Sequence, residues 1–184
     1  MMNKPLIATT SLAGCFGCHM SIMDLDDRIL QLIELIEFNK SPINDIKTLS
    51  KECDIGIIEG GCANSDNIRL LKEFRKNCRV LIAVGECAIM GGLPAMRNNS
   101  ASISECLQEA YIDCVSVQAN DEGLIPNDEE LPMLLDQVYP CHEIVKIDYF
   151  IPGCAPRADL IWDVLTALIS GKKMELSYEC FKFD

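Results

Sequence analysis

The chain has 184 residues, of which 49% are hydrophobic, and 16 basic against 28 acidic residues give it a formal net charge of −12. This length suits one domain with a buried core, and the apolar fraction excludes a disordered chain. The negative charge argues against a nucleic-acid partner or an anionic membrane surface, because both need a basic footprint.

No targeting or membrane-spanning segment is expected. Residues 1–12 lack the long apolar core of a secretion signal and contain no twin-arginine pair. No apolar run reaches the roughly 18–20 residues that are needed to span a bilayer. We therefore expect a cytoplasmic protein with no membrane span.

The predicted elements repeat a pattern of strand, glycine-containing loop and helix. Apolar runs predict strands over residues 5–12, 53–58, 79–84 and 144–151. Helical spacing of apolar residues predicts helices over residues 21–37, 66–76, 102–111 and 158–169. Ser21 is the expected N-cap of the first helix, Gly171 closes the last, and residues 112–140 are expected to be irregular. This alternation predicts an α/β fold with a doubly wound parallel sheet, as a single domain over residues 1–184.

Eleven cysteines are many for a chain without an export signal, so reduced thiols or metal ligation are favoured over disulfides. Four of them lie in the loops that follow predicted strands: Cys15, Cys18, Cys87 and Cys154. Because the carboxyl ends of parallel strands meet at one edge of a sheet, these loops should converge there. Neighbouring glycines let the backbone approach a bulky cluster and aim N–H groups at its sulfides. Four thiolates would saturate one 4Fe-4S cluster, which suits electron transfer.

The other seven cysteines are expected to be small buried hydrophobes or bystanders: Cys53, Cys62, Cys78, Cys106, Cys114, Cys141 and Cys180. Cys62 differs, because it lies in a loop on the cluster side and could approach the cluster. Glu59 ends the second strand on that side. It is either a solvated or capping carboxylate, or a proton relay beside the cluster. His19 follows Cys18 and could bond a ligand or face a partner.

Six stretches of sequence now match a known pattern, beginning with Ser-Leu-Ala-Gly-Cys-Phe-Gly-Cys-His-Met-Ser. They span residues 11–21, 24–26, 58–61, 85–88, 94–98 and 148–156. Together they resemble the small subunit of soluble NAD(P)-reducing, bidirectional nickel–iron hydrogenases. The resemblance implies a flavodoxin-like domain in which Cys15, Cys18, Cys87 and Cys154 hold the 4Fe-4S cluster next to the nickel–iron site of a large subunit. Diaphorase subunits with FMN and iron–sulfur clusters are the implied further partners.

Some features depart from that pattern or lie outside it. The expected Pro-Pro after the last ligand is Ala155-Pro156 here, and only Cys180 follows Cys154, so the next electron acceptor should lie in another subunit. Whether a flavin also binds this chain stays open, because no phosphate-cradling loop follows the first strand. Residues 91–96 are the expected contact loop for the large subunit.

Alternative functions remain at this point. The cluster-bearing subunit of respiratory complex I and the small subunits of membrane-bound, sulfur-reducing or coenzyme-coupled hydrogenases share the predicted fold, although complex I relatives use adjacent cysteines in the first motif. A thiol–disulfide oxidoreductase would use Cys15 and Cys18 but would not need Cys87 or Cys154. A structural zinc protein would use all four.

Overall fold

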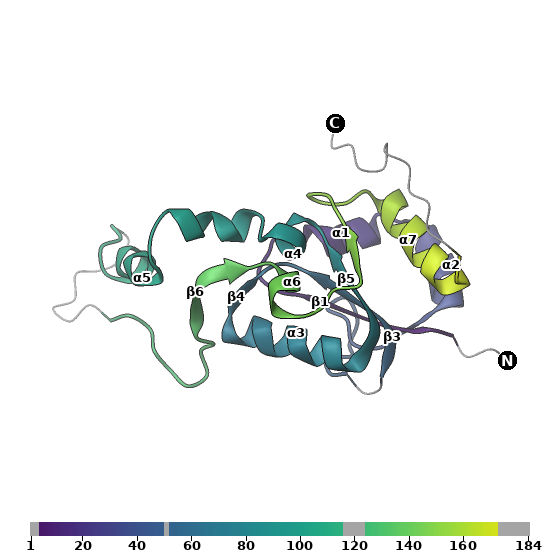
Figure 1. The fold of residues 1–184 in the computed structure, drawn as a ribbon, viewed down its shortest axis with the longest axis horizontal. Helices are drawn as coiled ribbons and strands as arrows, with labels where there is room; N and C mark the ends of the chain where they lie inside the picture. The colour runs from purple at the N-terminus through teal and green to yellow at the C-terminus, as the bar shows by residue number, and fades with distance from the viewer. Residues whose placement is uncertain (1–3, 50–51, 116–123, 173–184) are drawn as a thin grey trace.

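A computed structural model of the protein describes residues 4–49, 52–115 and 124–172. In these residues, five parallel strands form the main sheet, in the spatial order β2-β1-β3-β5-β7 (Figure 1). Their bounds are β1 Leu6–Ser11, β2 Glu37–Phe38, β3 Cys53–Glu59, β5 Cys78–Val84 and β7 Tyr149–Ile151. Counted along the chain, this order is 2-1-3-4-5, the flavodoxin-like arrangement.

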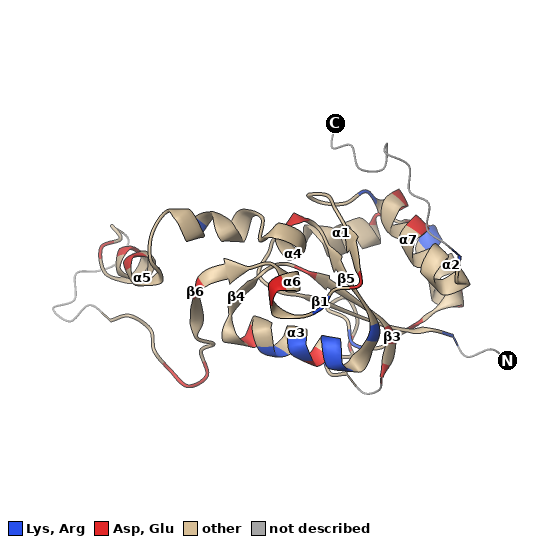
Figure 2. Ribbon diagram, in the orientation of Figure 1, with Lys and Arg blue, Asp and Glu red and all other residues tan. Residues whose placement is uncertain are grey.

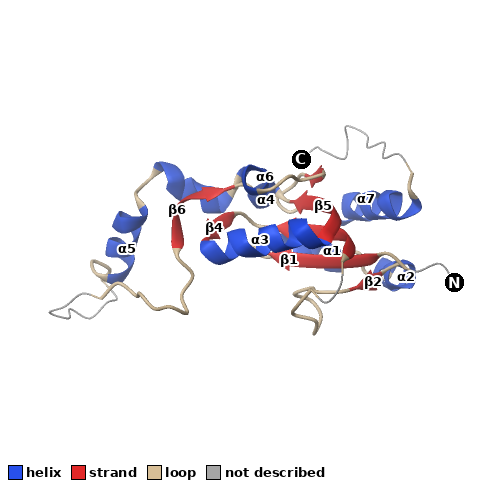
Figure 3. Ribbon diagram, turned by 60° about the horizontal axis from the view of Figure 1, so that its bottom comes forward, coloured by secondary structure: helices blue, strands red, loops and turns tan. Residues whose placement is uncertain are grey.

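Helices cover both faces of this sheet (Figure 3). One face is packed by α1 (Gly17–Met23), α2 (Arg28–Leu35) and α7 (Ala158–Ser170), and the other by α3 (Ser65–Asn77), α4 (Glu86–Met90) and α6 (Cys141–Ile144). Strand side chains alternate between the two cores, so that Ile57 packs with the first group and Ile58 with the second. Burial on both faces explains why the strands are nearly continuous apolar runs. The predicted doubly wound parallel sheet is confirmed.

The first predicted helix is two helices in the structure. α1 begins at Gly17 and ends at Met23, and α2 begins at Arg28. Ser21 is buried inside α1 and is not an N-cap, so that prediction was wrong. The break falls in an acidic run in which Asp26 takes a positive φ of 49°. Aspartate tolerates this conformation and favours turns, which explains the interruption.

Two further differences lie in the second half of the chain. The strand predicted over residues 144–151 is shorter, because α6 takes its first residue and β7 begins only at Tyr149. Residues 112–140 are not irregular throughout, because β6 (Leu134–Tyr139) pairs antiparallel with β4 (Cys62–Asn64). The partner of β6 lies about 70 positions earlier in the chain, so local sequence could not reveal this strand.

An arm extends from the main body (Figure 1). It begins with the 3-10 helix η1 (Leu93–Asn99) and continues with α5 (Ile103–Tyr111), whose N-terminus is closed by a capping box between Ser102 and Glu105. Arg97 ties its base to β6, with Nη1 and Nη2 donating to the carbonyls of Asp136 and Leu135 at 3.0 and 2.6 Å.

The densest group of basic residues lies on α3 (Figure 2), and one of them, Arg75, forms a partly buried ion pair. Its Nη1 donates to Asp148 Oδ2 at 2.6 Å, and the same oxygen accepts the N–H of Leu81 at 2.8 Å. Burial tends to raise the pKa of Asp148. The hydrogen bonds from Arg75 and Leu81 and the charges of Arg75 and Lys146 outweigh it and lower the pKa.

We expect Asp148→Asn to lower the free energy of unfolding by about 1–3 kcal/mol at pH 7, since a charged hydrogen bond is lost. The folded-state pKa lies below the unfolded value of about 3.9, so this stabilisation is present above pH 4 and lost as the pH falls below it. Urea unfolding of both proteins at pH 7 and pH 3 should therefore show a difference that shrinks in acid. Asp159→Asn is the control. The side chain of Asp159 is 62% exposed and pairs with Arg28 at the surface, so this variant should have little effect on stability at either pH. An equal difference at both pH values for Asp148→Asn would contradict the prediction.

Candidate metal centre

The four predicted cysteine ligands lie in loops at the carboxyl edge of the main sheet. Cys15 follows β1 and Cys18 lies in the first turn of α1, whereas Cys87 is the second residue of α4, after β5, and Cys154 follows β7. The strand order reverses between β1 and β3, and doubly wound sheets bind ligands in the crevice at such a point. The predicted convergence of these loops is present in the fold.

Backbone hydrogen bonds join these loops in pairs. The N–H of Glu86 donates to Gly153 O at 3.1 Å, and the N–H of Gly153 donates back to Glu86 Oε1 at 3.0 Å. On the other side, Ala13 and Gly61 exchange two backbone hydrogen bonds of 3.0 and 2.8 Å. The loop of Cys87 is thereby fastened to that of Cys154, and the loop of Cys15 to the segment after Glu59.

The four thiols influence one another electrostatically. Burial raises the pKa of Cys18, and the charges of Glu59, Cys87 and Cys15 raise it further. Burial also raises the pKa of Cys87, against a hydrogen bond from the backbone of Leu93, and the charges of Cys154, Cys15 and Glu59 add to this. Thiolates gathered in this way repel one another, so a bound cation or cationic cluster would stabilise them.

Glycines let two of the thiols lie directly against the backbone. A Cβ atom added to Gly85, which has a φ of +83°, would lie 2.3 Å from Cys18 Sγ, and one added to Gly92 would lie 2.9 Å from Cys87 Sγ. Within the described residues, no three or more His, Cys, Asp or Glu side chains surround a position for a single metal ion. A cubane cluster is wider than one ion, and its four cysteine ligands stand correspondingly further apart. The donor set of four thiols is the one that such a cluster takes.

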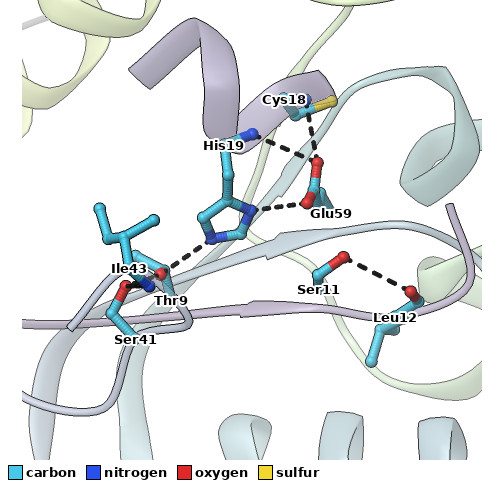
Figure 4. A network of polar contacts seen from close by, with 8 residues as sticks. All are labelled: Thr9, Ser11, Leu12, Cys18, His19, Ser41, Ile43 and Glu59. Atoms are coloured by element: carbon cyan, nitrogen blue, oxygen red, sulfur yellow. Dashed lines mark hydrogen bonds and ion pairs between the residues drawn. The ribbon is translucent and has the colours of Figure 1, made fainter. Parts of the chain in front are cut away.

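Glu59 lies at the end of β3 with 3% of its surface exposed. Its Oε2 accepts the N–H groups of Cys18 and His19 at 3.0 and 3.3 Å, and its Oε1 lies 2.7 Å from His19 Nδ1 (Figure 4). Burial tends to raise the pKa of Glu59, but the hydrogen bond and charge of His19, with hydrogen bonds from Ser11 and Cys18, lower it overall. Glu59 is therefore a buried carboxylate that caps the Cys18 turn, and the solvated alternative is excluded.

The sequence left open whether His19 bonds a ligand or faces a partner, and the structure places its ring in the core. Its ring is 1% exposed, stacks on Phe16 with centroids 4.7 Å apart, and joins Glu59 to the Thr9 hydroxyl, 2.9 Å from its Nε2. The available signal was the run of hydroxyl residues Thr9, Thr10 and Ser11 in a predicted strand. Such a group needs a partner, because an unsatisfied buried polar atom is costly.

The remaining cysteines in the described residues pair with one another or lie elsewhere. Cys62 and Cys141 are both 0% exposed and share a hydrogen bond, and Cys141 Sγ also donates to Gly60 O at 3.4 Å. Cys53 and Cys78 are buried register partners at the other end of β3 and β5. Cys106 and Cys114 are half-buried in and after α5. Cys180 lies outside the described residues.

The surface beside Cys87 and Cys154 is apolar. The predicted contact loop, residues 91–96, is exposed there, with Leu93 at 73% and Met96 at 64%. An adjacent cavity of about 440 Å³ is lined by Glu86, Ile89, Met90, Pro152 and Cys154. Exposed apolar patches of this kind mark sites of protein association. None of the helices in the described parts of the chain is both long and apolar enough to cross a membrane.

Known proteins resemble the chain over nearly all of its length. The delta subunit of the NAD-reducing hydrogenase HoxS of Cupriavidus necator is 42% identical over 182 residues, 99% of this chain and 87% of that protein. One subunit of the F420-non-reducing hydrogenase of Methanothermobacter marburgensis is 38% identical over 96% of this chain, which spans only 57% of that protein.

A crystal structure of an NAD+-reducing nickel–iron hydrogenase in the H2-reduced state contains a chain with 46% identity and a TM-score of 0.93, over 99% of this chain and 100% of that one. A sequence profile described as NADH ubiquinone oxidoreductase, 20 Kd subunit, matches residues 15–168. The chain therefore belongs to the NADH ubiquinone oxidoreductase 20 kDa subunit family, together with the small subunits of NAD-reducing nickel–iron hydrogenases.

Proposed function

We propose that this chain is the electron-transfer small subunit of a cytoplasmic, NAD(P)-linked nickel–iron hydrogenase, and that residues 1–184 form its single domain. The observation that carries the proposal is the meeting of three cysteine-bearing loops at the carboxyl edge of β1, β5 and β7. The 42% identical relative, named an NAD-reducing hydrogenase subunit, supports the choice of reaction. The nickel–iron site itself would belong to a partner large subunit.

Cys15, Cys18, Cys87 and Cys154 would hold one 4Fe-4S cluster. A cluster bound there supplies one-electron transfer between the large subunit's metal site and diaphorase subunits with FMN and further clusters. The chain contributes four thiolates, and glycines against which Cys18 Sγ and Cys87 Sγ lie without conflict with a Cβ atom. Of the two readings of Glu59, a capping carboxylate or a proton relay, its hydrogen bonds support the capping role, because Oε2 accepts the N–H groups of Cys18 and His19.

Anaerobic purification of the full chain with its co-expressed partner subunits tests this function. We expect about four iron and four sulfide for the cluster of this chain, nickel in the co-purified large subunit, and hydrogen-dependent reduction of NAD(P). A colourless chain with zinc alone would contradict the cluster. Iron and sulfide without nickel or hydrogen turnover would favour the alternative, a subunit of a complex I-related assembly.

The large subunit should bind across the apolar surface beside Cys87. We expect Leu93→Glu to weaken its association at least about tenfold, because a glutamate there would place an unpaired charge in a buried apolar contact, and about 1.4 kcal/mol is tenfold. The cluster should be retained, since only the backbone of Leu93 bonds to Cys87. Co-purification with a tagged large subunit measures the effect. Leu30→Glu, at a 63% exposed leucine of α2, is the matched control. Equal recovery of both variants would refute this placement of the interface.

A further inference from the structure

A chain of buried hydrogen bonds runs from the first cysteine motif into the core (Figure 4). Glu59 Oε1 lies 2.7 Å from His19 Nδ1, His19 Nε2 lies 2.9 Å from Thr9 Oγ1, and Thr9 Oγ1 lies 2.7 Å from Ser41 Oγ. We call these four residues, Thr9, His19, Ser41 and Glu59, the His19 network. They come from β1, α1, the segment after β2, and the end of β3, so the network ties four separate parts of the chain together.

The His19 network is buried and fully satisfied. Its members are between 0 and 3% exposed, and no buried side-chain nitrogen or oxygen in the described residues lacks a partner. One assignment of donors uses every group. The N–H of Ile43 donates to Ser41, Ser41 to Thr9, Thr9 to His19 Nε2, and His19 Nδ1 to Glu59. Because both ring nitrogens lie within hydrogen-bond distance of buried partners, the imidazole is held in one orientation.

The held imidazole decides where the carboxylate of Glu59 points. With Oε1 engaged by His19, Oε2 faces the N–H groups of Cys18 and His19 at 3.0 and 3.3 Å. These two N–H groups are thereby directed away from cysteine and sulfide sulfur, and a negative charge is fixed beside Cys18. Fewer hydrogen bonds to sulfur and more nearby negative charge both lower the reduction potential of an iron–sulfur cluster.

We propose that His19 is a positioning residue that holds Glu59 against the Cys18 turn and thereby lowers the reduction potential of the cluster. The inference rests on the proposed function, because it needs a cluster at Cys15, Cys18, Cys87 and Cys154. His19 acts only through Glu59 and need not touch any ligand sulfur.

Two substitutions of His19 separate its two contacts. The amide nitrogen of asparagine can take the position of Nδ1, so His19→Asn should keep the bond to Glu59. The amide of glutamine can take the position of Nε2, so His19→Gln should keep the hydrogen bond to Thr9 and lose the one to Glu59. A redox titration of the full chain, co-expressed with its large subunit and followed by electron paramagnetic resonance, measures the potential.

We expect His19→Gln to raise the reduced-to-oxidised ratio at a fixed ambient potential about tenfold, about 59 mV for one electron. His19→Asn should stay within about twofold of the wild-type ratio, and Thr9→Val should shift it in the same direction as His19→Gln but by less. His142→Gln, at the other histidine of the chain, is the control and should not shift it.

A double-mutant cycle distinguishes positioning from a general structural role. If His19 acts through Glu59, the shift of the double variant His19→Gln/Glu59→Gln should equal that of Glu59→Gln alone. Additive shifts, or an unchanged potential in an iron-loaded His19→Gln chain, would overturn the proposal. If His19→Gln fails to fold, the Thr9→Val variant takes its place in the test. An unchanged reduction potential in Thr9→Val would then overturn the proposal. Absence of iron and sulfide from the wild-type chain would instead refute the proposed function.

Discussion

Cys18→Ala should reduce the iron and sulfide of the cluster from about four each to less than about one per chain, and abolish hydrogen-dependent NAD(P) reduction. Cys18 is half-buried, and its thiol lies within electrostatic range of Cys87, Cys15 and Glu59. Alanine removes the thiolate and leaves an iron atom open to solvent or oxidants. Iron and sulfide analysis with the visible absorbance of the anaerobically purified complex measures the loss. Cys15→Ala, Cys87→Ala and Cys154→Ala should behave alike.

Cys62→Ala is the matched control for these variants. Cys62 is also on the cluster side and is 0% exposed, but its thiol bonds to Cys141. We therefore expect full iron content and a loss of about 1–2 kcal/mol in the free energy of unfolding. If Cys62→Ala lost iron while Cys154→Ala kept it, the proposed ligand set would be wrong.

Gly85→Ala should lower the iron content by more than half without removing a ligand. Gly85 has a φ of +83°, and an added Cβ would lie 2.3 Å from Cys18 Sγ, closer than two such atoms can approach. Cys18 must then move, although its backbone is fastened to Glu59 at 3.0 Å. Backbone strain at a positive φ adds a cost on the order of 1–3 kcal/mol. Iron content and thermal unfolding of the same preparation measure the two effects separately.

Gly171→Ala separates strain from steric conflict. Gly171 ends α7 with a φ of +62°, and an added Cβ there would meet nothing within 4 Å. This variant should lose about 1 kcal/mol of stability and keep its iron. A similar loss of iron in both glycine variants would mean that general destabilisation, and not displacement of Cys18, empties the site.

The strands and the arrangement of the cysteine loops could be predicted from the sequence because their determinants are local. Each strand of the main sheet except the short β2 is an apolar run bounded by a glycine-containing loop, and burial on both sides of a parallel sheet requires such a run. Once the sheet is parallel, geometry alone brings Cys15, Cys87 and Cys154 to one edge. The loops could be assigned in this way without any knowledge of tertiary contacts.

Other features were decided only by contacts between distant parts of the chain. β6 is a strand because it meets β4, which lies about 70 positions earlier in the chain. His19 illustrates the physical reason best. A histidine after a cysteine has no fixed role in sequence, since its ring can be solvated, bound to metal or buried. Thr9, Ser41 and Glu59 surround it only after folding, and only then does the cost of leaving buried polar atoms unpaired give the ring one orientation.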